Sequence, residues 1–204
     1  MHTVTPSPTP ARQRLLAAAA RVFARDGLSG ATTRAIAREA KVNEVTLFRQ
    51  FGTKERLLDA VVREHFGPDA PGETRNVKSL PGNLRKDLTA HARHYAELLQ
   101  HNLPLIRAMI GEIHHHADHE QQVYRAIFRP LRAALIARLE AAVAAGTLTR
   151  QISPTILADL FAGMIFTGVL SRASAHVRRE YPANDYLAAA VDLVLRGAAK
   201  VSVA

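Results

Sequence analysis

The side chains best suited to chemistry in this sequence are histidines at short spacing. Three are consecutive at 114–116 and a fourth stands at 119, while His91 and His94 are three residues apart. On a helix, His115 and His119 lie on one face, a spacing that suits zinc or nickel. Two other interpretations remain open: solvated histidines near a helix end, or polar groups lining a ligand pocket. Since no HExxH motif or cysteine accompanies them, we predict no bound metal or cofactor.

A second set of residues has types and spacing that suit DNA binding. Residues 32–51 read TTRAIAREAKVNEVTLFRQF, which forms two short helical stretches separated by a turn near Lys41 and Val42. Ile36 in the first stretch can pack on Leu47 in the second. This spacing is typical of a helix-turn-helix, whose second helix enters the major groove.

Helices are the elements that must position these residues. Apolar side chains recur with a period near 3.6, and β-branched runs bounded by turn residues are scarce, so we predict an all-α fold. Gly27 should end the first helix as a left-handed cap, and Pro130 should kink a later one. The ranges expected to be helical are about 13–24, 33–40, 44–50, 54–62, 84–100, 105–116, 120–145, 154–175 and 184–200.

Charge and composition narrow the class of protein. The 204 residues carry a formal charge of +9, with 11 basic and 6 acidic side chains in residues 1–66, which favours a polyanionic partner. Cysteine is absent, which excludes disulfide scaffolds and thiolate catalysis. Residues 1–10 hold three prolines and no apolar core of a signal peptide. No apolar run is long enough to span a membrane, so we expect a cytoplasmic protein with no membrane partner.

Four consecutive motifs carry a resemblance to a known family. They are FARDG at 23–27, ATTRAIAREA at 31–40, VNEVTLFRQF at 42–51 and GTKERLL at 52–58. Together they resemble the TetR family of bacterial transcriptional regulators, without a gap from about residue 15 to 62. The resemblance implies an N-terminal three-helix helix-turn-helix DNA-binding domain and a larger helical ligand-binding and dimerisation domain. We therefore expect an arm at 1–10, the first domain at 11–66 and the second at 67–204.

The same resemblance, combined with side-chain chemistry, indicates which residues touch DNA. Thr32 or Thr33 can cap a helix and offer a hydroxyl to a phosphate, and Glu44 can accept from a cytosine amine. Arg49 can bind a phosphate or pair with Glu55. The full expected set is Thr32, Thr33, Arg34, Lys41, Asn43, Glu44, Val45, Thr46, Phe48, Arg49 and Lys54.

Three of these positions depart from the family pattern. Lys41 and Val45 stand where the family usually has glycine. Lys41 adds a cation in the turn, and the side chain of Val45 opposes the close approach of the backbone that glycine allows. Phe48 replaces a tyrosine whose hydroxyl binds phosphate, so this bond is lost and Phe48 can instead be a core residue. Lys54 matches the lysine that binds backbone phosphate in the family.

The C-terminal helices are expected to form an effector pocket and a homodimer interface. The apolar residues of these helices have types and spacing that suit a pocket lining and a plain core equally well. The candidate pocket residues are Tyr95, Met109, Ile113, His116, Phe128, Phe161, Met164 and Ile165. The candidate interface residues are Leu160, Gly163, Thr167, Gly168, Leu187, Val191 and Val194.

The function predicted is therefore that of a regulator and not of an enzyme. A dimeric repressor would bind a palindromic double-stranded DNA operator and leave it when a small-molecule effector binds. One alternative is a metal-dependent hydrolase that uses the histidine cluster with Glu112 or Asp118. Another is a helical adaptor that binds an acidic protein, although this leaves the pattern from Thr32 to Lys54 unexplained.

Overall fold

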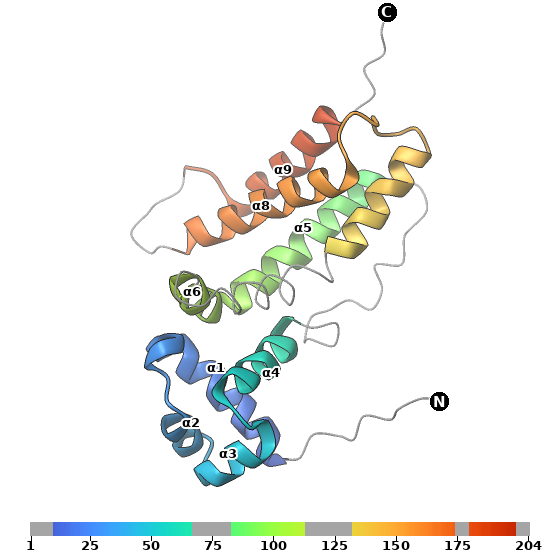
Figure 1. The fold of residues 1–204 in the computed structure, drawn as a ribbon. Coiled ribbons are helices and arrows are strands. Elements are labelled where there is room, and N and C mark those ends of the chain that lie inside the picture. Colours follow the sequence, from blue (N-terminus) through green and yellow to red (C-terminus); the bar gives the residue numbers. More distant parts are fainter. Residues whose placement is uncertain (1–9, 67–82, 113–131, 174–179, 199–204) are drawn as a thin grey trace, which may run out of the picture. The chain divides into compact units, whose positions relative to one another are not determined.

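A computed structural model describes residues 10–66, 83–112, 132–173 and 180–198 of the chain. These residues form helices joined by turns, which confirms the predicted all-α class (Figure 1). Residues 132–144 form a helical segment as well, and the expected kink at Pro130 lies outside the described residues. The named helices are α1 (Pro10–Gly30), α2 (Thr33–Glu39), α3 (Glu44–Phe51), α4 (Lys54–Phe66), α5 (Leu84–His101), α6 (Leu103–Glu112), α8 (Pro154–Arg172) and α9 (Ala183–Gly197).

Contacts divide the chain into two compact units. One comprises Met1–Ala70 with Pro104–Ile127, and the other comprises Pro71–Leu103 with Phe128–Ala204. This division differs from the domains expected from the sequence, at 11–66 and 67–204, because most of α6 belongs to the first unit. Leu105, Ile106 and Met109 of α6 are buried on one face, and such a face needs an apolar surface to pack against.

The core of the first unit forms where α1 packs on α2, α3 and α4. Every helix contributes apolar side chains at the spacing of one helical face, as the sequence pattern predicts. The most completely buried of them are Leu15, Val22, Phe23, Ile36, Leu47, Leu57 and Val61. This core is what fixes α2 and α3 relative to each other.

Gly27 interrupts α1, but not in the conformation that the sequence suggested. Its φ of 75° and ψ of 171° lie outside the helical region, and outside the left-handed cap as well. A side chain makes this conformation very unfavourable, so glycine is required here. One more turn follows to Gly30, since the Ala31 amide donates to the Gly27 carbonyl at 3.2 Å.

In the second unit, α5, α8 and α9 pack against one another. His91 of α5 is buried, with its ring centre 6.4 Å from that of Tyr95 and 6.3 Å from that of Phe161. Burial, with a smaller contribution from His94, lowers the pKa of His91 to about 4, so its imidazole is neutral at neutral pH. Asp87, also buried on α5, pairs with Arg138 of the helical segment 132–144.

A close contact between a glycine and a tyrosine joins α8 to α9. The ring of Tyr186 lies directly against Gly168, and its hydroxyl donates to the Met164 carbonyl at 2.8 Å. The guanidinium of Arg172 stacks on the same ring, 4.5 Å from its centre, and donates to the Gly168 carbonyl at 3.0 Å. The ring is therefore held from several sides and cannot easily move away.

Gly168→Ala should destabilise the second unit. A methyl group at this position would lie 2.2 Å from Cε1 of Tyr186, and overpacking of this kind costs about 1–3 kcal/mol. Thermal and urea unfolding of the full chain measure the effect. The matched control is Gly197→Ala on α9, where the added methyl meets no atom within 4 Å. Equal stability of the two variants would contradict this account of the contact.

Candidate nucleic-acid interface

The helix α2 ends in a turn in which one residue, Lys41, has a left-handed backbone conformation. Lys41 has a φ of 55° and is the one non-glycine residue with positive φ among the described residues. The Lys41 amide donates to the Arg38 carbonyl at 3.1 Å, and the Val42 amide donates to the Ala37 carbonyl at 3.0 Å. This is the hydrogen-bond pattern of a Schellman motif, in which glycine is favoured at the position that Lys41 occupies. The turn thus keeps the conformation that glycine would favour.

Side-chain hydrogen bonds that involve Thr32, Thr33 and Asn43 fix the starts of α2 and α3. Thr32 is the N-cap of α2, since its Oγ1 accepts from the Ala35 amide at 3.1 Å. Asn43 caps α3 in the same manner, with Oδ1 accepting from the Val45 amide at 3.0 Å. Thr33 has a different role, because its hydroxyl donates to Oε1 of Glu44 at 2.5 Å. One oxygen of Glu44 is therefore engaged within the protein, while the carboxylate has further acceptor positions.

The surface of α3 carries large apolar side chains that the described residues leave exposed. Leu47 and Phe51 are buried, whereas Val45 is 72% exposed and Phe48 is 47% exposed. Phe48 is thus not a core residue, which answers the alternative that the sequence left open. Arg49 is exposed beside it, and Thr46 is half-buried.

Lys54 has an internal partner at the start of α4. Its Nζ donates to the Ala31 carbonyl at 2.8 Å, which ties α4 to the connection between α1 and α2. An ammonium group has three donors, so two remain for a phosphate. Thr53 begins α4 as expected, since its Oγ1 accepts from the Arg56 amide at 3.2 Å.

Two of the arginines in the first unit are neutralised by carboxylates. Arg21 and Arg25 bind Glu39, at 2.7 Å and 3.1 Å, and Arg25 also binds Asp26 at 2.8 Å. The hydrogen bond from Arg21 is the largest cause of the lowered pKa of Glu39. These pairs are exposed, so each contributes little to stability.

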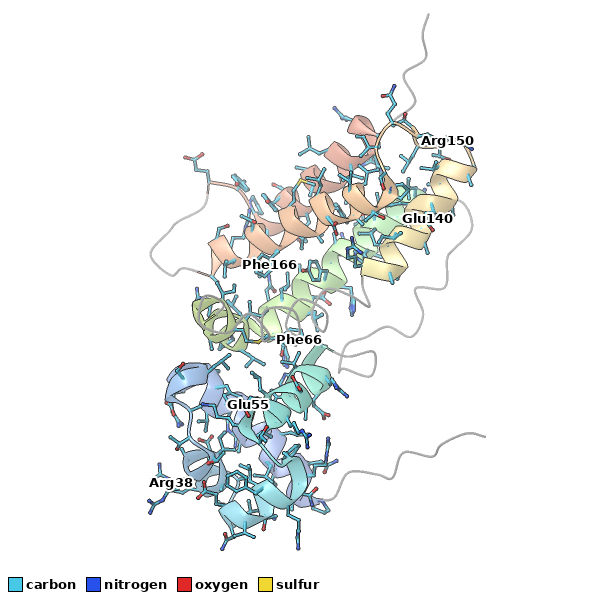
Figure 2. The ribbon with its side chains drawn as sticks, in the orientation of Figure 1. Arg38, Glu55, Phe66, Glu140, Arg150 and Phe166 are labelled. Atoms are coloured by element: carbon cyan, nitrogen blue, oxygen red, sulfur yellow. The ribbon has the colours of Figure 1, made fainter. Side chains whose placement is uncertain are left out.

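By contrast, Arg34 and Arg38 on α2 have no ion-pair partner among the described residues. Both are exposed, and Figure 2 shows the Arg38 side chain extending away from α2. An open hollow of about 500 Å³ lies between α2 and α3 on this surface. It is lined by Thr32, Arg34, Ala35, Ala37, Arg38, Val42, Asn43 and Glu44. Sequence reasoning did not select Arg38, although its place one turn after Arg34 was a usable signal.

In the second unit, the predicted interface residues divide between a surface and a core. Leu160 is 58% exposed, and Gly163 and Thr167 are exposed with it on one face of α8. Leu187 of α9 is half-buried. The prediction is wrong for Gly168, Val191 and Val194, because these residues are buried within the chain itself.

The apolar character of α8 goes beyond what one buried face requires. Among the described residues, α8 is the helix that is long and apolar enough to cross a membrane, judged only by length and composition. The length of the apolar runs in the sequence predicted no membrane-spanning segment. A core helix of a soluble protein passes the same test, and Leu157, Phe161 and Ile165 of α8 are buried.

The predicted effector residues are only partly brought together. Tyr95, Phe161 and Ile165 are buried in the second unit and Met164 is half-buried there, while Met109 is buried in the first unit. Ile113, His116 and Phe128 lie outside the described residues, as do His114, His115 and His119. His91, whose ring lies near those of Tyr95 and Phe161, joins this group. The sequence left open whether its histidines bind metal, face solvent or line a pocket. No group of three or more His, Asp or Glu suited to a metal occurs among the described residues, so the hydrolase hypothesis gains no support.

Two family models match the chain. "Bacterial regulatory proteins, tetR family" matches residues 15–61, and "Tetracyclin repressor-like, C-terminal domain" matches residues 81–194. The uncharacterized HTH-type transcriptional regulator YvkB of Bacillus subtilis (strain 168) is 30% identical over 103 residues. That alignment covers 50% of this chain and 52% of YvkB, so the chain matches about half the length of this curated relative.

Solved structures show the same fold at low sequence identity. The fatty acid degradation regulator FadR from Bacillus halodurans superposes with a TM-score of 0.77 at 17% identity, over 94% of this chain and 98% of that one. FadR from Bacillus subtilis, in complex with stearoyl-CoA, gives 0.75 at 18% identity, over 91% and 98%. A regulator from Mesorhizobium loti gives 0.74 at 19% identity, over 93% and 96%.

Replacing Lys41 with glycine should stabilise the first unit. A left-handed conformation costs a non-glycine residue roughly 1–2 kcal/mol, which the greater chain entropy of glycine offsets only in part. We expect a gain of about 1 kcal/mol, or a rise of about 2–4 °C in Tm if the chain unfolds as one unit. Lys41→Ala is the control, because it removes the charge but keeps Cβ. A glycine variant no more stable than the alanine variant would show that the turn carries no strain.

Proposed function

The chain belongs to the TetR family of bacterial regulatory proteins, and we propose that it is a transcriptional regulator that binds a palindromic operator as a homodimer. In this proposal it represses transcription, and a small molecule releases it from DNA. The observation that carries the proposal is the surface of α2 and α3, where apolar side chains are exposed together with arginines that have no ion-pair partner among the described residues.

The exposed face of α3 has the chemistry needed to read base edges. Val45 and the methyl group of Thr46 can contact a thymine methyl, and Glu44 can accept from the amine of cytosine with acceptor positions that Thr33 leaves open. Phe48 is exposed on the same helix. Apolar side chains exposed together among polar ones are typical of a surface that contacts a partner.

The basic residues around α3 suit the DNA backbone. We assign phosphate contacts to Arg34, Lys41, Arg49 and Lys54, and we add the hydroxyl of Thr32, whose proton is not used by the cap. Phosphate contacts of this kind supply affinity and orientation, and the base contacts of α3 supply specificity. A dimer would carry a formal charge of about +18, which speeds the encounter with DNA.

The exposed face of α8 suits a second copy of the chain. Ile156, Leu160, Gly163 and Thr167 follow each other at intervals of four, three and four residues, so they form one stripe along the helix. Gly163 allows close approach because it has no side chain, and the space beside its Cα is open in the single chain. Two such stripes related by two-fold symmetry would bury each other, and the dimer would present two recognition helices to two half-sites.

A small molecule would act through the second unit. Tyr95, Phe161, Met164 and Ile165, with His91 between two of them, are the residues that we propose line the effector site. The effector must bind more tightly to the conformation that does not fit the operator, because equal affinity for both conformations would release nothing.

Binding to a genomic DNA fragment tests this proposal. The full chain is titrated into labelled DNA from upstream of its own coding sequence, at 50 mM salt and with excess random-sequence competitor. We expect a complex that survives the competitor and weakens steeply as salt increases. If no upstream or neighbouring fragment forms such a complex, the proposed function is wrong.

Leu160→Glu tests the dimer. A charge placed in an apolar interface should convert the dimer to monomers in analytical ultracentrifugation, and operator affinity should fall by at least about 100-fold, because each half-site is then bound separately. Gln100→Glu adds the same charge on the exposed side of α5 and serves as the control. A Leu160→Glu variant that remains dimeric would remove this face from the interface.

A further inference from the structure

We propose that Arg38 is a DNA-contacting residue, and that it binds a backbone phosphate together with Arg34 in the hollow between α2 and α3. The inference rests on the proposed function, because it adds a residue and a mode of contact to the same DNA-binding surface. The geometry of α2, the charge balance of the hollow and the chemistry of the guanidinium group each lead to it.

The position of Arg38 on α2 places it beside Arg34. The two residues are four apart on one helix, so their side chains leave the same face of α2, with Cβ atoms about 5–6 Å apart. Both line the hollow, which at about 500 Å³ is far larger than a phosphate group needs. Both are exposed, so an incoming strand meets no side chain that must first be displaced.

Among the described residues, the charge of the two arginines in the hollow is not balanced by ion pairs. Glu44 is the carboxylate among the residues that line it, and its Oε1 accepts a hydrogen bond from Thr33 at 2.5 Å. No ion pair joins Glu44 to either arginine among the described residues, whereas Arg21 and Arg25 nearby have carboxylate partners at 2.7–3.1 Å. Thr33 engages one oxygen of the carboxylate, and neither arginine is ion-paired with it among the described residues, so the two guanidinium groups can bind an anion from outside.

The anion that best fits this surface is a phosphodiester. A guanidinium group binds two oxygens of a phosphate through parallel N–H donors, and two such groups can hold the oxygens from two sides. The hydroxyl of Thr32 at the edge of the hollow adds a neutral donor. In helix-turn-helix proteins the first helix of the motif crosses the backbone and the second enters the groove, which favours a phosphate over a base as the partner of a residue on α2.

The salt dependence of DNA binding tests the role of Arg38. The probe is the upstream genomic fragment bound by the wild-type full chain, and its affinity is measured by fluorescence anisotropy from 50 to 200 mM salt. Removal of one phosphate contact lowers the slope of log K against log salt by about one for each subunit. We expect this reduction for Arg38→Gln, with about a tenfold loss of affinity at 50 mM salt. The same loss should occur on fragments with altered operator bases.

The matched control is Arg63→Gln, which removes the same charge from the exposed side of the last turn of α4. Its slope should equal that of the wild-type chain. An Arg38→Gln slope equal to that of Arg63→Gln would overturn the inference while the proposed function stands. A changed preference among operator bases without a change in slope would also overturn it, since Arg38 would then contact a base. If the wild-type chain binds no genomic fragment, both the inference and the proposed function are wrong.

Discussion

The placement of α3 is the constraint on which the candidate interface depends. An eight-residue helix is not stable alone in water, and α3 buries only Leu47 and Phe51. Its orientation therefore relies on the core that Leu47 and Phe51 join, together with the left-handed turn at Lys41 and the hydrogen bond from Thr33 to Glu44. Because these contacts fix the start of α3, its remaining residues are free to face outward. A surface of Val45, Phe48 and Arg49 is possible only because so few side chains are needed to hold the helix.

Two exposed surfaces among the described residues, one in each unit, are candidates for contact with a partner. In the first unit, carboxylates neutralise Arg21 and Arg25 on the side of α1, while Arg34 and Arg38 on α2 are left without carboxylates. In the second unit, α8 has one apolar face packed within the chain and another, with Ile156 and Leu160, exposed to solvent. Both surfaces cost free energy in an isolated chain. A polyanion would offset the cost at the surface of α2 and α3, and a second copy of the chain would offset it at α8.

Much of this architecture follows from the sequence, because helical periodicity and capping residues act locally. Asn43 and Thr53 begin helices as their side chains suggest, and the buried residues of α1 follow the apolar pattern. What the sequence does not reveal depends on tertiary contacts. The internal hydrogen bonds of Thr33 and Lys54 join partners 11 and 23 residues away, which no local pattern reveals. Gly168, Val191 and Val194 have the same composition as an interface, and only packing separates an internal contact from an external one.

The rate at which hydroxyl radicals oxidise aromatic side chains tests the central claim, which is that the exposed face of α3 lies against DNA. Phe48 is 47% exposed and Tyr181 in the second unit is 45% exposed, so both report solvent access and Tyr181 is an internal reference. With the upstream fragment bound, the oxidation rate of Phe48 should fall several-fold while that of Tyr181 stays constant. A Phe48 rate that is unchanged in the DNA complex would contradict the account.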